Sequence, residues 1–251
     1  MNGRFVDDVW RDLPKDIYAT YYYEVGYPAM PAMQKTDLRM TGMMRNGANI
    51  LGLDCLAEFK PRLAASQNPK PENVIRDAYV CISLKGTQPC KSWHNPEGWG
   101  KVVRFLKDKG YRVLCIDGDD VSNEVGYREI MQAGCEDFTG YRPLQDRVDL
   151  LCGAKFFIGM ASGLSWLAWA CGKKVVMISG FSLPYSEFYT PYRVINTEVC
   201  HGCWNDMRYP YQPYLYTKCP LHQGTDRQFE CSKAITGEMV LEKIEELIRT
   251  L

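Results

Sequence analysis

Four cysteines in the C-terminal part of the chain have the spacing of metal ligands. Cys200 and Cys203 form a Cys-x-x-Cys pair, and Cys219 and Cys231 follow after gaps of 15 and 11 residues. Four thiolates can bind one zinc or iron ion in a closed tetrahedral shell, which leaves no open position for a substrate. Four unligated thiols are the less favoured alternative, because exposed loop thiols are reactive. The sequence therefore predicts one structural ion at these cysteines.

Two loops that follow predicted strands have the composition of anion-binding loops. The first, residues 83–93, contains hydroxyl groups and the lysines Lys85 and Lys91, and it leads into a predicted helix. In the second, small residues connect a strand to a helix, so backbone N–H groups can approach an anion closely. Solvated loop charges and a tight turn against a buried helix would explain the same residues without a ligand. The candidate anion-binding groups are the ammonium groups of Lys85 and Lys91 and the backbone of residues 159–169, which include Ser162, Gly163, Leu164 and Ser165.

A third loop, residues 117–120, contains three acidic side chains. Asp117 comes directly after a predicted strand, where an acid can accept hydrogen bonds from the hydroxyl groups of a ribose. Three neighbouring carboxylates are also typical of a divalent cation site. A turn with acids at the start of a helix fits the pattern equally well. Asp117 is thus a candidate ribose ligand, and a divalent cation site and a turn at the start of a helix are the two alternatives.

The elements that would position these loops alternate between strands and helices. Continuous apolar runs predict strands at 79–84, 111–116, 155–159, 174–179 and 192–196. Capping residues and helical spacing predict helices from Asn95-Pro96 to Gly110 and at 123–133, 144–152, 163–171 and 237–249. This alternation is typical of an α/β fold in which helices cover both faces of a Rossmann-like parallel sheet. Ligands of such sheets bind beyond the carboxyl ends of the strands, so the loops that start at Ser83, Asp117, Gly159 and Ser179 should surround the site.

Composition excludes several other classes of protein. The 251 residues are 46% hydrophobic, which suits one large globular domain or two small ones. Thirty basic residues balance thirty acidic ones, so we expect no nucleic-acid partner. The longest uncharged stretch, 156–172, is shorter than the roughly 20 apolar residues of a membrane span. The acidic start, with Asp7 and Asp8, is unlike a signal peptide, and scattered cysteines in apolar surroundings favour the cytoplasm.

These patterns divide the chain into four segments. Residues 1–66 lack a clear period and are interpreted as a truncated N-terminal or linking segment. A turn that contains prolines leads to the Rossmann-like domain, residues 72–198. The four-cysteine finger covers residues 199–232, and a C-terminal helix lies within residues 233–251.

Several motifs together resemble those of the bacterial autotransporter heptosyltransferases, which have two facing Rossmann-like domains of the GT-B type. The stretches 35–39, 50–54 and Pro61-Arg62 resemble the segment that leads into the second domain of that family. Cys90 to Trp93, with Asn95 and Gly98-Trp99, resembles its phosphate loop, and Ser162 to Ala170 resembles its donor-binding turn. The four cysteines resemble its metal finger, which holds iron. Ala161 and Trp166 stand where lipopolysaccharide heptosyltransferases carry Asp and His, which favours the autotransporter branch.

The resemblance implies transfer of heptose from ADP-heptose to serine hydroxyls of an autotransporter passenger. Lys91 would contact the diphosphate, and the turn from Ser162 to Ser165 would hold the phosphates and the sugar. Asp117 is a weaker candidate for the ribose. The resemblance favours iron at the four cysteines, and thiolate chemistry by itself leaves zinc as the alternative.

The resemblance also bears on the N-terminal part of the chain. Enzymes of that family have a complete N-terminal acceptor domain, which supplies the catalytic group, and only about 66 residues precede the linker here. We therefore expect the donor-binding half of a split enzyme, working as a homo-oligomer or with a partner subunit that carries the acceptor domain. No catalytic residue is assigned, and Asp37 is not taken as the base. The alternative is a non-catalytic nucleotide-sugar-binding or assembly subunit, and another donor sugar stays open.

Overall fold

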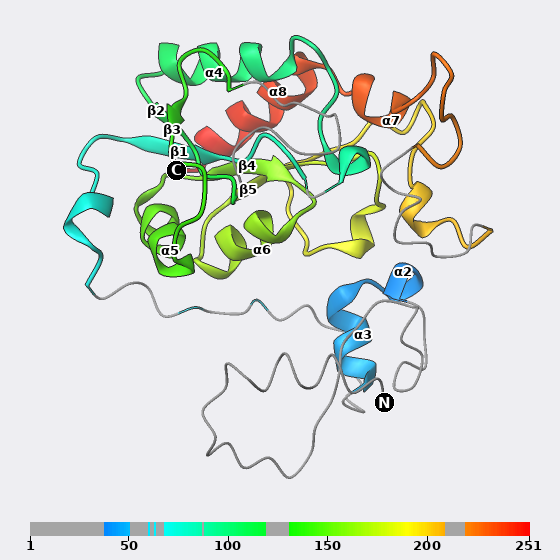
Figure 1. Ribbon diagram of the computed structural model, residues 1–251, viewed down its shortest axis with the longest axis horizontal. Coiled ribbons are helices and arrows are strands. Elements are labelled where there is room, and N and C mark those ends of the chain that lie inside the picture. Colours follow the sequence, from blue (N-terminus) through cyan, green and yellow to red (C-terminus); the bar gives the residue numbers. More distant parts are fainter. Residues whose placement is uncertain are drawn as a thin grey trace.

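A single parallel sheet forms the centre of the molecule. The structure, a computed structural model, describes residues 38–50, 60, 63, 68–86, 88–118, 131–208 and 219–251 (Figure 1). Within these ranges the sheet has the order β3-β2-β1-β4-β5-β6, and every neighbouring pair is parallel. The strands are β1 (Tyr79–Ile82), β2 (Arg112–Cys115), β3 (Glu136–Asp137), β4 (Phe157–Met160), β5 (Val175–Ile178) and β6 (Arg193–Val194).

Helices cover both faces of the sheet, as the alternation of strands and helices predicts. On one face lie α4 (Gly98–Asp108) and α8 (Gly237–Ile248), and on the other α5 (Leu144–Gly153) and α6 (Gly163–Ala170) (Figure 1). Strand β1 shows why its sequence is apolar throughout. Val80 and Ile82 belong to the core beneath α4 and α8, whereas Tyr79 and Cys81 belong to the core beneath α5 and α6. Because both faces of the strand are buried, polar and apolar residues do not alternate along it.

The strand order reverses direction between β1 and β4, which are neighbours in the sheet although β2 and β3 lie between them in the chain. Loops that leave adjacent strands at such a reversal separate to opposite faces and open a crevice at the carboxyl edge. The loops at this edge begin at Ser83, Ile116, Ala161 and Ser179. The candidate anion-binding residues therefore follow strands that meet at one edge.

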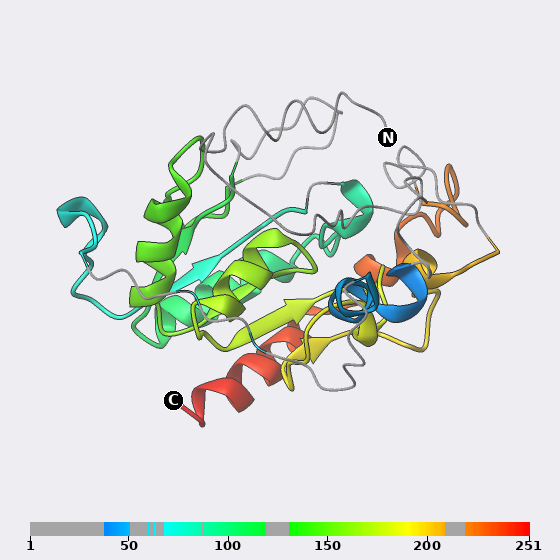
Figure 2. The same cartoon turned by 90° about the horizontal axis from the view of Figure 1, so that it is seen from below.

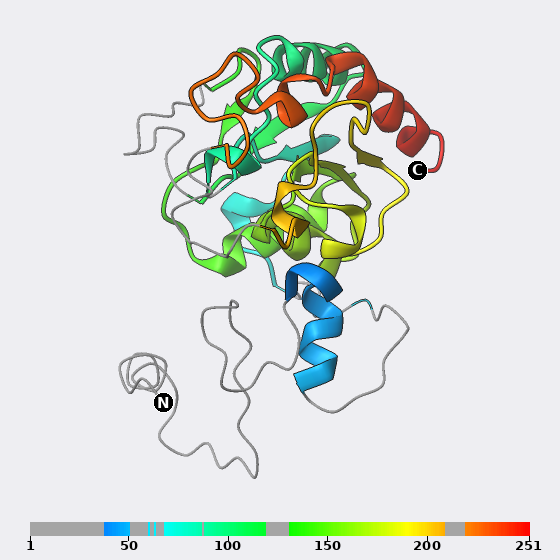
Figure 3. The ribbon, with the colours of Figure 1, turned by 90° about the vertical axis from the view of Figure 1, so that its right-hand side faces the viewer.

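Two short helices lie outside the sheet layers. These are α2 (Leu38–Thr41) and α3 (Met43–Ile50), and α2 contacts the 3₁₀ turns at Pro184–Ser186 and Cys203–Asn205 (Figures 2 and 3). The carbonyl of Arg39 accepts hydrogen bonds from Asn205 Nδ2 at 2.6 Å and from the Tyr185 hydroxyl at 3.3 Å. Gly42, at φ +79°, allows close approach, because a Cβ there would lie 2.2 Å from the carbonyl oxygen of Tyr185. The chain before the sheet thus packs against the segment that contains Cys203.

Some elements differ from the prediction. Helix α4 begins at Gly98 rather than Asn95, because the Asn95 side chain forms a local turn with the N–H of Glu97 and also binds the carbonyl of Lys233. Residues 131–133 of the helix predicted at 123–133 are not helical, and residues 119–130 lie outside the described ranges. Strand β3 and the short helix α7 (Glu230–Lys233) were not predicted, since two to four residues carry no clear period. No helix in the described ranges is long and apolar enough to cross a membrane.

Candidate functional site

Asp117 fastens the end of β2 to the end of β1. Its carboxylate accepts a hydrogen bond from the Ser83 hydroxyl at 2.5 Å and one from the N–H of Leu84 at 2.8 Å. Burial raises the pKa of Asp117, and the hydrogen bond from Ser83 is the largest opposing effect. The side chain thereby holds the start of the loop that leads to Lys91. Both carboxylate oxygens bind groups of the protein, and contact with a ribose stays a prediction.

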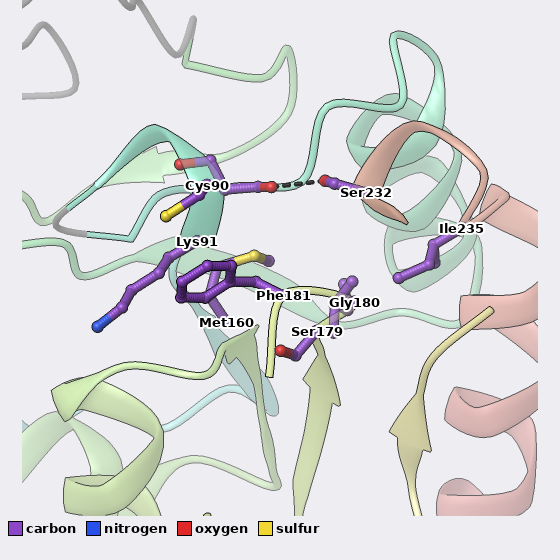
Figure 4. Close-up of a pocket in the computed structure, with 10 residues that line it drawn as sticks. Cys90, Lys91, Met160, Ser179, Gly180, Phe181, Ser232 and Ile235 are labelled. Carbon is purple, nitrogen blue, oxygen red and sulfur yellow. Dashed lines mark hydrogen bonds between the residues drawn. The ribbon is translucent and has the colours of Figure 1, made fainter. Parts of the chain in front are cut away.

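The loop after β1 folds back on itself and presents Lys91. A Cβ at Gly86 would lie 2.4 Å from the Cβ of Lys91, so only glycine allows the two segments to pack this closely. The N–H of Gly86 also donates to the Ser92 hydroxyl at 3.3 Å. The Lys91 side chain extends away from the other labelled residues in Figure 4 and makes no hydrogen bond or ion pair with the described part of the chain. Its ammonium group is available to an anion.

The turn after β4 leads directly into α6. Ser162 is the N-cap in an extended conformation, and its side chain does not cap the helix. Gly163 is exposed, and a Cβ there would meet nothing within 4 Å, so a ligand can approach the backbone. The first turn of a helix has N–H groups without intrahelical partners, which favours an anion there.

The other two predicted residues of this turn have contacts within the protein. Ser165 is buried, and its hydroxyl donates to the carbonyl of Met160 at 2.5 Å, which ties α6 to the end of β4. Leu164 packs against the core beneath α5 and α6. Their binding of phosphates or sugar stays a prediction. Trp166, whose residue type favours the autotransporter branch over the lipopolysaccharide heptosyltransferases, packs edge-on against Phe188 with ring centroids 5.1 Å apart.

A pocket lies between the Lys91 loop and the carboxyl ends of β4 and β5 (Figure 4). The space in it that a water-sized molecule can enter is about 10 Å³, so the pocket has room for about one water. The pocket does not include Ser162 to Ser165, which follow the same strand as Met160. Sequence reasoning singled out Lys91, the phosphate-loop stretch that begins at Cys90 and the loop at Ser179, but it missed Ser232. The lining residues are Cys90, Lys91, Ser92, Met160, Ile178, Ser179, Gly180, Phe181, Ser232 and Ile235.

The four predicted metal ligands gather beside this pocket. Cys203 and Cys219 are buried in one cluster with Phe181 and Phe229, and Cys200 packs against it. Burial raises the pKa of Cys203, and the nearby thiols of Cys200, Cys231 and Cys219 raise it further. Burial likewise raises the pKa of Cys231 to about 12. Thiols that would repel one another as anions in a buried site form the kind of donor set that a bound cation stabilises.

The sulfurs are nevertheless not arranged as a formed metal shell. Within the described ranges, no three side chains of His, Cys, Asp or Glu are grouped as metal ligands. Protonated thiols pack like small apolar groups, whereas an ion would draw the sulfurs to about 2.3 Å from itself. Residues 209–218, between the second and third cysteines, lie outside the described ranges. The donor set therefore fits one ion by its chemistry, and the closed shell stays a prediction.

Two glycines dock this cysteine cluster on the end of β5. A Cβ at Gly180 would lie 2.3 Å from the carbonyl oxygen of Cys231, so the cluster sits directly on the strand end. The N–H of Gly202 donates to the carbonyl of Gly180 at 2.8 Å. Gly202 has φ +71°, a conformation that side chains rarely adopt. The cluster and the pocket therefore share the loop after β5.

Comparison with known proteins gives matches over most of the chain. The family model of glycosyltransferase family 9 (heptosyltransferase) matches residues 53–212. The autotransporter heptosyltransferase Aah of Escherichia coli is 48% identical over 223 residues, which are 89% of this chain and 56% of Aah. The relative named inactive autotransporter heptosyltransferase BimC, of Burkholderia thailandensis, is 37% identical over 90% of this chain and 53% of BimC. The chain spans about half the length of these curated relatives.

A solved structure matches the fold and the sequence together. The crystal structure of the dodecameric iron-containing heptosyltransferase TibC, in complex with ADP-D-β-D-heptose, superposes with a TM-score of 0.85 at 46% identity. The match covers 95% of this chain and 62% of the TibC chain. The curated TibC sequence is that of Escherichia coli O78:H11 (strain H10407 / ETEC).

Proposed function

Since the chain belongs to glycosyltransferase family 9, the heptosyltransferase family, we propose that it binds ADP-heptose and takes part in transferring the heptose to serine hydroxyls of an autotransporter protein. The observation that carries this proposal is the likeness, over 95% of the chain, to a heptosyltransferase whose structure contains the ADP-linked sugar. The position of Lys91 in the loop after β1, at the carboxyl edge of the sheet, supports the same assignment.

In this proposal the diphosphate of the donor lies between Lys91 and the first turn of α6. The ammonium group of Lys91 neutralises phosphate charge, and backbone N–H groups around Gly163 bind phosphate oxygens. Ser162, Leu164 and Ser165 complete the turn that receives the phosphates and the sugar. Asp117 acts mainly through Ser83 and Leu84, whose positions it sets, with the ribose as a further proposed contact.

The chemistry requires two kinds of assistance. As the bond between heptose and diphosphate breaks, negative charge builds on the leaving phosphate, and Lys91 stabilises it. A general base must accept the proton of the attacking serine hydroxyl. None of the residues assigned here is such a base. We therefore propose that the acceptor site and the base lie outside the assigned donor site. A partner subunit, or another copy of this chain within a homo-oligomer, would supply them.

The four cysteines would hold a single iron ion with a structural role. The chemistry of the donor set supports this, as does the iron in the related TibC structure, with zinc as the alternative. When bound, the ion supplies cross-linking of the finger rather than a reaction step. Reduced thiolate ligands fit the cytoplasm, the compartment we propose for the protein.

A non-catalytic role in nucleotide-sugar binding or assembly is the second candidate. One relative at 37% identity bears the name of an inactive heptosyltransferase, so this fold is found without activity. In that case the chain would bind a nucleotide sugar and a partner protein but would not turn over the donor.

Calorimetry with ADP-heptose, followed by assay of ADP release with and without an autotransporter passenger, tests the proposal. We expect binding by this chain, and ADP release that depends on the passenger and on any partner that carries the base. Binding without release, even with a co-expressed partner, would favour the non-catalytic role. Absence of binding to ADP-heptose would refute the donor site, and stronger binding of another nucleotide sugar would correct the donor.

A further inference from the structure

A strained residue precedes one of the four cysteines. Phe229 has φ +58° and is the one residue other than glycine with a left-handed backbone in the described ranges. Such a conformation costs free energy and persists only where surrounding contacts hold it. The ring of Phe229 stacks on His94, with ring centroids 4.3 Å apart and planes 3° from parallel. Phe229 directly precedes α7, which contains Cys231, and His94 follows the Lys91 loop, so this stack joins the two segments.

Ser232 connects the same two segments by hydrogen bonds in both directions. Its hydroxyl donates to the carbonyl of Ser92 at 2.6 Å, the dashed line of Figure 4, and accepts the N–H of His94 at 2.8 Å. Ser232 is buried and directly follows Cys231. A buried hydroxyl that serves one donor and one acceptor is a strict constraint, because its loss removes both of these hydrogen bonds.

Two further hydrogen bonds join the same two segments. The Nε1–H of Trp93 donates to the carbonyl of Ile235 at 2.9 Å, and the side-chain amide of Asn95 donates to the carbonyl of Lys233 at 3.0 Å. Consecutive residues 92–95 therefore bind residues 232–235, which are about 140 positions later in the chain. Cys90, from the same loop, packs in the cluster of Cys203 and Cys219.

We propose that residues 229–235, here called the clamp, couple ion binding at the four cysteines to the conformation of the donor loop, with Ser232 as the positioning residue. A bound ion fixes Cys231 and therefore the adjacent Ser232. Ser232 then holds Ser92 and His94, and so orients Lys91 toward the donor. This inference rests on the proposed donor site. By thermodynamic linkage, an ion that tightens donor binding must itself be bound more tightly in the presence of the donor.

The test compares wild type with Ser232→Ala, each with its metal bound and after removal of the metal by a chelator. Hydrogen exchange of residues 88–94 is measured without nucleotide, and the affinity for ADP is measured by calorimetry. We expect metal-loaded Ser232→Ala to keep its ion, to exchange faster at 88–94 and to bind ADP about tenfold more weakly. Metal removal should weaken ADP binding in wild type and have little further effect in Ser232→Ala.

Thr190→Val is the matched control. The Thr190 hydroxyl also donates to a carbonyl, that of Val175 at 2.7 Å, and accepts an N–H, that of Tyr192 at 3.2 Å. Thr190 precedes β6 in the chain and binds the first residue of β5, at the opposite edge of the sheet from the donor loops. This variant should leave both the exchange of residues 88–94 and the affinity for ADP unchanged.

Two results would overturn the clamp. One is that metal-loaded Ser232→Ala has the same hydrogen exchange at residues 88–94 and the same ADP affinity as metal-loaded wild type. This comparison needs no chelated protein, so it tests the clamp even if removal of the metal unfolds the chain. The other is an equal loss of ADP affinity on metal removal in wild type and variant, because coupling would then bypass Ser232. If wild type binds neither ADP nor ADP-heptose, the proposed function fails, and the exchange of residues 88–94 still decides whether the clamp exists.

Discussion

Replacement of Lys91 by alanine should weaken the binding of ADP much more than that of adenosine. The ammonium group makes no hydrogen bond or ion pair with the described part of the chain, so its removal should leave the fold intact. The loop itself is held by other groups, since Gly86 packs against the Lys91 backbone and Asp117 fixes the start of the loop. The substitution therefore removes a charge for the diphosphate and little else.

The expected magnitude follows from the exposure of the side chain. A hydrogen bond that involves a charged group contributes about 1.5–3 kcal/mol, equivalent to a factor of roughly 10–150 in Kd. Lys91 is half-buried at the mouth of an open pocket, where solvent and salt screen its charge. We therefore expect the lower end, about a tenfold rise in the Kd for ADP, and a smaller effect at high salt.

Calorimetry with ADP and with adenosine at two salt concentrations measures this effect. Adenosine lacks the phosphates, so its affinity should not change in Lys91→Ala. Lys155→Ala is the control, because Lys155 is exposed and precedes β4 at the opposite edge of the sheet. Equal ADP affinity in Lys91→Ala and wild type would refute the phosphate contact. An equal loss for ADP and adenosine would show that the loop, rather than the charge, had been altered.

Three further changes test other parts of the site. Gly180→Ala should lower both the melting temperature and the metal content, because its Cβ would lie 2.3 Å from the Cys231 carbonyl oxygen. Gly47→Ala, in helix α3 and with nothing within 4 Å of its Cβ, should lower neither. Cys219→Ser should remove the metal. Elemental analysis of anaerobically prepared wild type is the reference, and less than about a tenth of an equivalent of transition metal there would contradict the closed site. Since burial raises the pKa of Asp117 above its ordinary 3.8, the folded state binds more protons there than the unfolded state. Its contribution to stability therefore falls as pH rises from about 4 through the raised pKa, and urea unfolding across this range should show that slope in wild type and lose it in Asp117→Asn.

Local burial explains what could be predicted from the sequence. A strand that is buried on both faces must be apolar at every position, so the run from Tyr79 to Ile82 predicted a covered parallel sheet, which the structure confirms. Helices with an apolar face, such as α8, were found close to their predicted bounds. The predicted start of α4 was wrong, because the Asn95 side chain forms a local turn with the N–H of Glu97 and binds the carbonyl of Lys233, and the helix begins only at Gly98.

Part of the candidate site could also be predicted from the sequence. The sequence by itself determined that Lys91 and the turn at Gly163 follow strands of one sheet, because parallel strands end at a common edge. The sequence also predicted a four-cysteine donor set, because a Cys-x-x-Cys pair followed by two further cysteines is typical of a metal site. The structure brings these cysteines together, and the bound ion stays a prediction. Chemistry that depends on residue type and on position relative to a strand can be read from a single sequence.

Only the tertiary structure decided how these parts meet. It placed the cysteine cluster on the end of β5, turned the carboxylate of Asp117 toward the β1 loop, and paired Ser232 with Ser92 and His94. These hydrogen bonds join residues that lie 138 and 140 positions apart in the sequence. Neither segment carries a local sequence pattern that identifies its partner. Formation of these hydrogen bonds depends on strand order and on close approach at Gly180, which are properties of the whole fold.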